Sequence, residues 1–196
     1  MLLPGILWEH AAELRYFPVE RGHVVFPGQE DARAELEAQI AAAKQMGLDV
    51  THLDTHMGAV LRPDLAQIYV DLALKERVPA FVPENLEDLH MPEPVRTALR
   101  DLLERTPLPR VRAVDSYPAP PDQRRRWYVQ TLSSLGPGVY HLIHHAAMAT
   151  PEAQNLPDWK KRLADFEALQ DPEVRRVVDR FTLLTYRQVR DAMRRL

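Results

Sequence analysis

Residues 51–56 read Thr-His-Leu-Asp-Thr-His, a run in which polar side chains alternate with other residues. This alternation predicts an extended strand with His52, Asp54 and His56 on one face, because strand side chains repeat with a period of two. The run lies between two predicted helices, where an α/β protein places the carboxyl end of a strand. Since α/β folds build their active sites at that end, two imidazoles and a carboxylate indicate a divalent metal site or an acid/base cluster.

The spacing of His52 and His56 limits how such a site can work. In a straight strand their Cα atoms lie about 13 Å apart, at ~3.3 Å per residue. Two nitrogens that bind one zinc ion at ~2.1 Å are at most about 4.2 Å apart. One histidine is therefore expected to be the ligand, with the others supporting it, unless the chain turns between them; Gly58 predicts a turn soon after His56. The alternative is a strand end whose polar groups are satisfied by ordinary hydrogen bonds.

The rest of the chain predicts helices and strands in alternation. Leu36 and Ile40 recur at helical spacing before a stop at Gly47. Pro63 opens a helix with a clean apolar stripe. The order favours one α/β domain over residues 1–196, with a parallel sheet and right-handed crossovers, either open or closed into a barrel. One expected helix covers residues 30 to about 46, and another begins at residue 63. The other expected helices cover 93–105, 120–132, 158–169, 172–180 and 185–196. The expected strands cover 49–54, 79–83, 111–114, 139–145 and 181–184.

The composition excludes several classes of function. The 196 residues contain no cysteine, so disulfides, thiolate zinc sites and cysteine nucleophiles are excluded. A net charge of -3 argues against a general nucleic-acid binder, which is usually basic. No apolar run approaches the ~20 residues that span a bilayer. The N-terminus is apolar but lacks the basic region and the long apolar region of a signal peptide. We therefore expect a cytoplasmic chain with no membrane or nucleic-acid partner.

Further candidate residues lie at other predicted strand ends. His144 and His145 end the strand 139–145, and adjacent strand residues point to opposite faces, so only one can face the site. Asp115 follows another strand and could reach the same rim. Arg162 and Asp165 are one helical turn apart, which by default predicts an exposed ion pair.

The segment around residue 125 carries both charge and aromatic rings. Arg124, Arg125 and Arg126 are expected to form a solvated helix face. Trp127 and Tyr128 could stack on a sugar ring, but aromatic residues at helical spacing more often pack in a core.

Three motifs together resemble the YdjC/ChbG-like carbohydrate deacetylase family. Residues 51–58, Thr-His-Leu-Asp-Thr-His-Met-Gly, are similar to the family segment T-H-x-D-S-H. Residues 136–140, Gly-Pro-Gly-Val-Tyr, lead to His145 much as in the family strand P-G-V-x-E-x-x-x-H-P. The tail from residue 158 to residue 187 also follows the family pattern. The resemblance covers about residue 22 to the end of the chain.

This resemblance implies a (β/α) barrel-like fold and the removal of N-acetyl groups from sugars with the help of a divalent metal. It implies that His56 is a metal ligand and that His145 acts as general acid and protonates the departing nitrogen. Asp54 is expected to be a catalytic carboxylate, and a small carbohydrate is the implied substrate. Four further residues are expected to shape the site: His52, Asp115, Arg162 and Asp165.

Two family motifs that precede the T-H-x-D segment are not visible in this sequence. In the family, a first strand ending in Asp-Asp supplies a ligand and the base, and a later Gly-x-His supplies another ligand. Because one of three implied ligands remains, we expect Mg or Zn to be weakly held or absent, and activity to be impaired. The implied barrel is incomplete without its first strands, and an exposed sheet edge favours a homo-oligomer. The alternatives are a non-catalytic relative that binds a carbohydrate or protein partner, and a stable α/β domain of unknown role.

Overall fold

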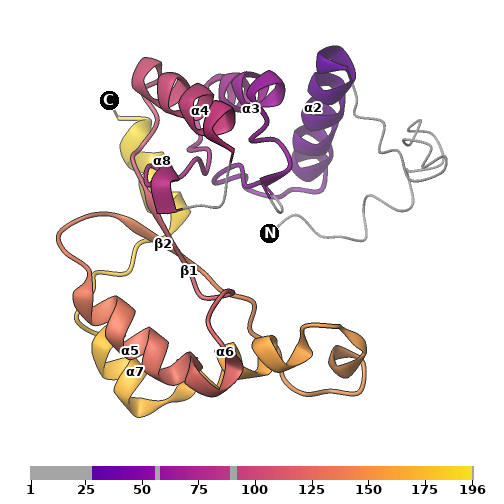
Figure 1. Cartoon of the computed structure of the whole chain (residues 1–196). Coiled ribbons are helices and arrows are strands. Elements are labelled where there is room, and N and C mark those ends of the chain that lie inside the picture. The colour runs from indigo at the N-terminus through magenta and orange to yellow at the C-terminus, as the bar shows by residue number, and fades with distance from the viewer. Residues whose placement is uncertain (1–27, 56–57, 89–91, 196) are drawn as a thin grey trace. The chain divides into compact units, whose positions relative to one another are not determined.

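The structure is a computed structural model that describes residues 28–55, 58–88 and 92–195. Helices alternate along the chain with short extended segments, and two strands pair in parallel (Figure 1). The predicted α/β class with a parallel sheet is therefore confirmed. The chain divides into two compact units, of which the first draws on Met1–Val82, Met91–Leu108 and Tyr186–Leu196 and the second on Pro83–His90 and Pro109–Thr185. The single domain over residues 1–196 stays a prediction.

The described residues of the first unit form four helices, and the helix bounds follow the local sequence signals. Helix α2 ends just before Gly47, which has a φ of 75°, a value that suits a glycine after a helix C-terminus. Helix α3 begins with Pro63, where a missing N–H costs nothing. Both boundaries confirm the prediction. The four helices are α2 (Gln29–Gln45), α3 (Pro63–Glu76), α4 (Glu93–Arg105) and α8 (Tyr186–Met193).

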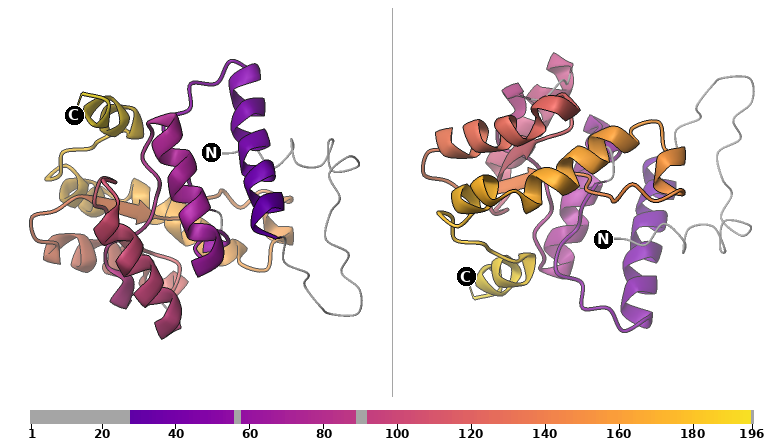
Figure 2. Two further views of the ribbon diagram at one scale, coloured as in Figure 1. Left: turned by 90° about the horizontal axis from the view of Figure 1, so that it is seen from above. Right: turned by 90° about the horizontal axis from the view of Figure 1, so that it is seen from below.

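Helices α2 and α3 lie side by side in both views of Figure 2 and bury a shared apolar cluster. The stripe predicted on α3 is buried in full, since every apolar residue at that spacing is at most 6% exposed. Leu36, Leu53 and Val60 pack against the edge of the cluster. Its buried members are Ala32, Ile40, Leu65, Ile68 and Leu72.

The histidine-containing segment is extended, as predicted, but its pairing is short. Leu53 forms a single parallel bridge with Ala80. The hydroxyl of Tyr69, a residue of α3 that is 2% exposed, donates to the Leu53 carbonyl at 2.7 Å and accepts the Phe81 N–H at 3.1 Å. A helix side chain therefore supports the two segments where a longer strand ladder would otherwise do so.

The second unit contains the parallel pair β1 (Arg112–Asp115) and β2 (Tyr140–Ile143), with Asp115 opposite Ile143 at the end of the register. The amide side chain of Asn85 bonds the main chain of Ala113 in β1 twice, at 2.9 and 2.7 Å. An isolated bridge joins Pro83 to Val111. The helices of this unit are α5 (Arg124–Ser134), α6 (Trp159–Gln170) and α7 (Pro172–Val178), with short 3-10 turns at Leu86–Asp88, Pro121–Gln123 and Ala153–Asn155.

Helices α5, α6 and α7 enclose the core of the second unit. Tyr128 is fully buried in this cluster and Trp127 packs against it, so the core prediction for these two aromatic residues is confirmed. Leu142 brings β2 into contact with the same cluster. The buried members are Tyr128, Leu132, Ala168, Val174 and Val177.

Two predictions near the C-terminus are wrong. Residues 181–184 form no strand, and Leu183 and Leu184 are 74% and 55% exposed. The β-like composition fails here because the segment finds no strand to pair with among the described residues. The spacing of Val189, Ala192 and Met193 also predicts a buried apolar stripe on the last helix. In α8, however, the buried residue is Arg190, and Ala192 is exposed. Among the described helices, none combines the length and apolarity needed to cross a membrane.

Candidate functional site

His145 lies two residues beyond the end of β2 and is tied to helix α6 through its main chain. The His145 N–H donates to Asp165 Oδ2 at 3.0 Å. Two residues later, the Ala147 N–H donates to the Arg162 carbonyl at 3.1 Å. The imidazole is half-buried, whereas the side chain of His144 is exposed. Of the two adjacent histidines, His145 is therefore the one that the structure holds in place.

Asp165 is the centre of a buried polar cluster. Its carboxylate is 1% exposed and accepts hydrogen bonds from Ser116 Oγ at 3.1 Å and from the Tyr128 hydroxyl at 2.9 Å. The Arg124 guanidinium, also 1% exposed, pairs with the same carboxylate at 3.1 Å. The prediction of an exposed pair between Arg162 and Asp165 is wrong, because Arg162 instead bonds the Asp158 carboxylate at 2.9 Å.

Arg124 also corrects the expectation of a solvated face at residues 124–126. It starts α5 and points inward, where Nη1 donates to the Ser116 carbonyl and forms an ion pair with Asp165 Oδ1. Its Nε and Nη2 atoms are buried and have no hydrogen-bond partner in the part of the chain that the structure describes. Arg125, one residue later, matches the prediction, since its exposed side chain pairs with Asp171. Burial, with the nearby Asp165 charge adding to it, raises the pKa of the Tyr128 hydroxyl in this cluster.

The His145 imidazole meets the ring of Tyr117 edge to face, with centroids 5.7 Å apart and planes at 82°. The parallel register explains this contact, because Tyr117 and His145 each lie two residues beyond the paired ends Asp115 and Ile143. Asp115 Oδ1 accepts the Tyr117 N–H at 2.9 Å and so fixes the turn that carries the ring. Lys161 Nζ lies 4.0 Å from the Tyr117 ring centroid, within range of a cation–π contact.

A carboxylate completes the surroundings of His145. The hydrogen bond from Arg162 lowers the pKa of Asp158 below its ordinary value of 3.8, and electrostatic attraction to His145 acts in the same direction. The structure thus gathers His145, Asp115, Arg162 and Asp165 in the second unit. Their functional roles stay predictions.

His52 and Asp54 lie in the first unit, on either side of the Leu53 bridge. The His52 ring stacks on the ring of Tyr186, with centroids 3.9 Å apart and planes at 4°, and its Nδ1 lies 3.0 Å from Thr51 Oγ1. Asp54 is exposed and accepts the N–H of Thr55 at 2.9 Å. Burial, and next the charge of Asp54, raise the pKa of the Tyr186 hydroxyl, so His52 and Asp54 both lie near one phenol ring.

The turn expected after the histidine motif is present. Gly58 has a φ of 69°, and its N–H donates to the Thr55 carbonyl at 3.2 Å. His56, the residue implied to bind a metal, lies outside the described residues. Within the described ranges, no three His, Asp or Glu side chains come together in a way that could hold a metal ion. The described donors alone therefore do not make up a metal site.

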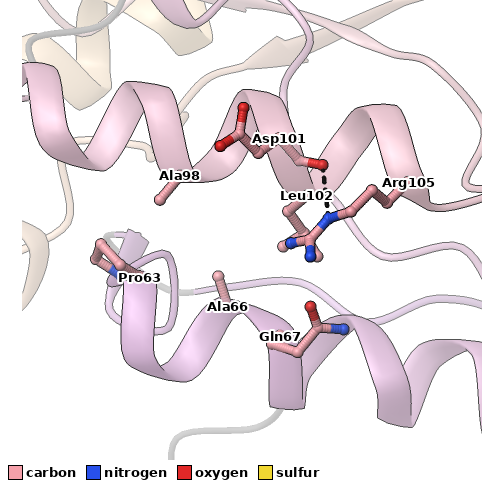
Figure 3. Close-up of a pocket in the computed structure, with 7 residues that line it drawn as sticks. All are labelled: Pro63, Ala66, Gln67, Ala98, Asp101, Leu102 and Arg105. Carbon is pink, nitrogen blue, oxygen red and sulfur yellow. Dashed lines mark hydrogen bonds between the residues drawn. The ribbon is translucent and has the colours of Figure 1, made fainter.

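A shallow pocket of about 180 Å³ lies between α3 and α4 (Figure 3). The Arg105 Nε atom donates to the Asp101 carbonyl at 3.0 Å along its edge. None of the predicted site residues lines it, and two of the residues that do are small alanines. The lining residues are Pro63, Ala66, Gln67, Ala98, Asp101, Leu102 and Arg105.

Sequence reasoning missed several residues that surround the predicted ones. The parallel register could have indicated Tyr117, since it occupies the same position after β1 that His145 occupies after β2. Nothing in the pattern distinguishes the buried Arg124 from the exposed Arg125. Tyr186 lies within the tail that resembles the family, and that pattern does not predict its stack on His52, which joins positions far apart in the sequence.

Comparison with known proteins identifies a family and two similar proteins. The family model described as YdjC-like protein matches residues 3–180. A carbohydrate deacetylase of Thermus thermophilus is 50% identical over 164 residues, which are 84% of this chain and 61% of that protein. The chain therefore spans about three fifths of the length of this relative. A crystal structure of a proposed cellobiose-phosphate cleavage protein from Enterococcus faecalis V583 has a similar fold, with a TM-score of 0.65 at 18% identity over 83% of this chain and 61% of that one. The chain belongs to the YdjC-like family.

Proposed function

We propose that this chain is a hydrolase that removes N-acetyl groups from amino sugars or acetylated oligosaccharides. The observation that carries the proposal is the 50% identity to a protein named carbohydrate deacetylase. The T-H-x-D and strand-end histidine motifs of the sequence support it. The substrate is a small carbohydrate, and the bond broken is the amide C–N bond of the acetamido group.

In the proposed reaction, a water oxygen attacks the acetamide carbonyl carbon and the C–N bond breaks. The His145 imidazole gives its proton to the departing nitrogen, so the products are acetate and a free amino sugar. The exposed carboxylate of Asp54 is the proposed base for the water. A divalent cation, Mg or Zn, would polarise the carbonyl when bound, with His56 as a proposed ligand. Impaired activity of the chain as given stays a prediction.

Support for the acid role comes from the surroundings of His145. Its main chain is fixed by Asp165, and its ring rests against Tyr117 near the Asp158 carboxylate. Tyr117 is 37% exposed, so its ring is available to a sugar beside the imidazole. A barrel-like fold is part of the proposal, supported by the resemblance of this chain to the YdjC/ChbG-like family. A cytoplasmic location and self-association through a sheet edge stay predictions.

The test is acetate release from N-acetylated chito-oligosaccharides by the full chain, with Mg or Zn added. His145→Ala should reduce kcat by about 100-fold or more, since general acid catalysis contributes ~100- to 10,000-fold. His144→Ala is the matched control, because this adjacent histidine is exposed, and its kcat should stay within about twofold. A folded, metal-loaded wild type that releases no acetate would contradict the proposal. Saturable sugar binding in that sample would favour the non-catalytic alternative.

A further inference from the structure

We propose that Asp165 is a positioning residue: its carboxylate fixes the main chain at His145 and so sets where the imidazole is presented beyond β2. This inference rests on the catalytic role proposed for His145. The hydrogen bond from the His145 N–H to Asp165 Oδ2, at 3.0 Å, is the contact through which Asp165 acts.

The two oxygens of Asp165 face different parts of the fold. Oδ1 contacts Tyr128 and Arg124, both on α5. Oδ2 contacts Ser116, which directly follows β1, and His145, which follows β2. One buried carboxylate on α6 thus joins α5 to the ends of both parallel strands. Its Oδ1 atom pairs with Arg124, and its Oδ2 atom contacts the residues that follow the two strands.

His145 needs such a contact because the β ladder has already ended. The register stops at Ile143, and residues 144–150 belong to no helix or strand. The main-chain N–H groups of His145 and Ala147 both donate to residues of α6. A displacement of ~1 Å in a catalytic group can reduce a rate ~100-fold. The hydrogen bond that fixes the main chain of His145 should therefore affect the rate of proton transfer from its imidazole.

Asp165→Asn tests this contact, although it also removes the charge that pairs with Arg124. The two groups that can only donate are the His145 N–H on the Oδ2 side and the Arg124 guanidinium on the Oδ1 side. An asparagine has one carbonyl oxygen and one NH2 group, so it cannot accept from both. The guanidinium charge attracts the carbonyl oxygen more strongly, and the NH2 group then faces the His145 N–H. The substitution keeps the side-chain shape while breaking the contact with His145.

The experiment measures amide hydrogen exchange at residue 145 together with kcat and KM on an N-acetylated chito-oligosaccharide. In the unmutated chain, the His145 amide should exchange at least about tenfold more slowly than that of its exposed neighbour Ala146. In Asp165→Asn this protection should be lost and kcat should fall about 10- to 100-fold, with KM within about threefold. Asn85→Ala is the matched control, because it removes another buried side chain that bonds the main chain of the second unit. That variant should lose stability but keep the His145 protection and kcat within about twofold.

Each outcome decides the proposal. Equal exchange of the His145 and Ala146 amides in the wild type would overturn it, and this comparison needs no variant to fold. Unchanged His145 protection in Asp165→Asn would also overturn it, as would the same fall of kcat in Asn85→Ala. If the wild type releases no acetate, the deacetylase function fails, while the exchange data still decide whether Asp165 holds His145.

Discussion

The ring of Tyr186 lies flat against the imidazole of His52, with centroids 3.9 Å apart. This stack joins the first turn of α8 to the histidine motif, which lies more than 130 positions earlier in the sequence. Stacked aromatic pairs contribute about 0.5–1.5 kcal/mol beyond their buried area. A double-mutant cycle of Tyr186→Ala and His52→Ala, measured by urea unfolding, should show a coupling free energy in that range. If the losses of unfolding free energy in the two single variants add up to that of the double variant within about 0.3 kcal/mol, the expected coupling is contradicted.

Two arginines of α8 bind the same carboxylate but differ in burial. Arg190 and Arg187 both pair with Asp49, and Arg190 also donates to the Val50 carbonyl at 3.2 Å. The Arg190 side chain is 7% exposed and that of Arg187 is 56% exposed. Arg190→Ala should lower the free energy of unfolding by about 1–3 kcal/mol, because the charged hydrogen bonds of a buried guanidinium are lost. Arg187→Ala should lower it by less than about 1 kcal/mol, and a larger loss for Arg187 than for Arg190 would contradict the difference in burial.

Alkaline pH should destabilise the chain through buried phenols. Burial raises the folded-state pKa of Tyr69, Tyr128 and Tyr186 above the ordinary value of 10.0. Each phenol therefore contributes stability that is fully present below pH 10 and is lost as pH rises toward the folded-state pKa. Urea midpoints should fall with rising pH above about 10. Tyr186→Phe, which keeps the ring, should reduce the slope of that fall, and an unchanged slope would mean that Tyr186 ionises freely in the folded state.

Acid should destabilise the surroundings of His145 through Asp158. Hydrogen bonding from Arg162 lowers its folded-state pKa below 3.8, so its contribution is present above the unfolded value and is lost as pH falls through the folded one. The difference in unfolding free energy between the wild type and Asp158→Asn should be constant from pH 7 to about pH 5 and should shrink below about pH 4. A difference that grows on acidification would show that the sign is wrong.

The ion pair of Arg124 and Asp165 should behave as a buried unit. Both side chains are 1% exposed, so removal of one leaves an uncompensated charge in the interior. Arg124→Leu should therefore lower the free energy of unfolding by about 3–5 kcal/mol. The double variant Arg124→Leu/Asp165→Asn should be less destabilised than the sum of the single ones, as measured by urea unfolding. Strict additivity would indicate that the two side chains act independently.

The helices were predictable because their signals are local. The apolar stripe of α3, the proline at its start and the glycine after α2 each act within a few residues. The bounds Glu93–Arg105 of α4 agree with the prediction for the same reason. Residues 181–184 failed because strand formation depends on a distant partner, which composition alone cannot reveal.

The residues of the candidate site around His145 were predictable only where a sequence motif contains them. His145 was indicated by its place at a strand end, and the structure places Asp115 and Asp165 in its surroundings. The burial of Arg124 was not predictable, because it depends on a carboxylate on another helix 41 positions away (165 against 124). Charge patterns on a helix show which residues can be solvated, but the partner across the core decides which one is buried.

The crowding around Asp165 has a consequence for catalysis. A carboxylate offers about four lone pairs, and in Asp165 they meet Ser116, Tyr128, Arg124 and the His145 N–H. No acceptor capacity is left to take a proton from water or to coordinate a cation. In the proposed deacetylation, Asp165 is therefore left with the positioning role alone, and the base is a different carboxylate.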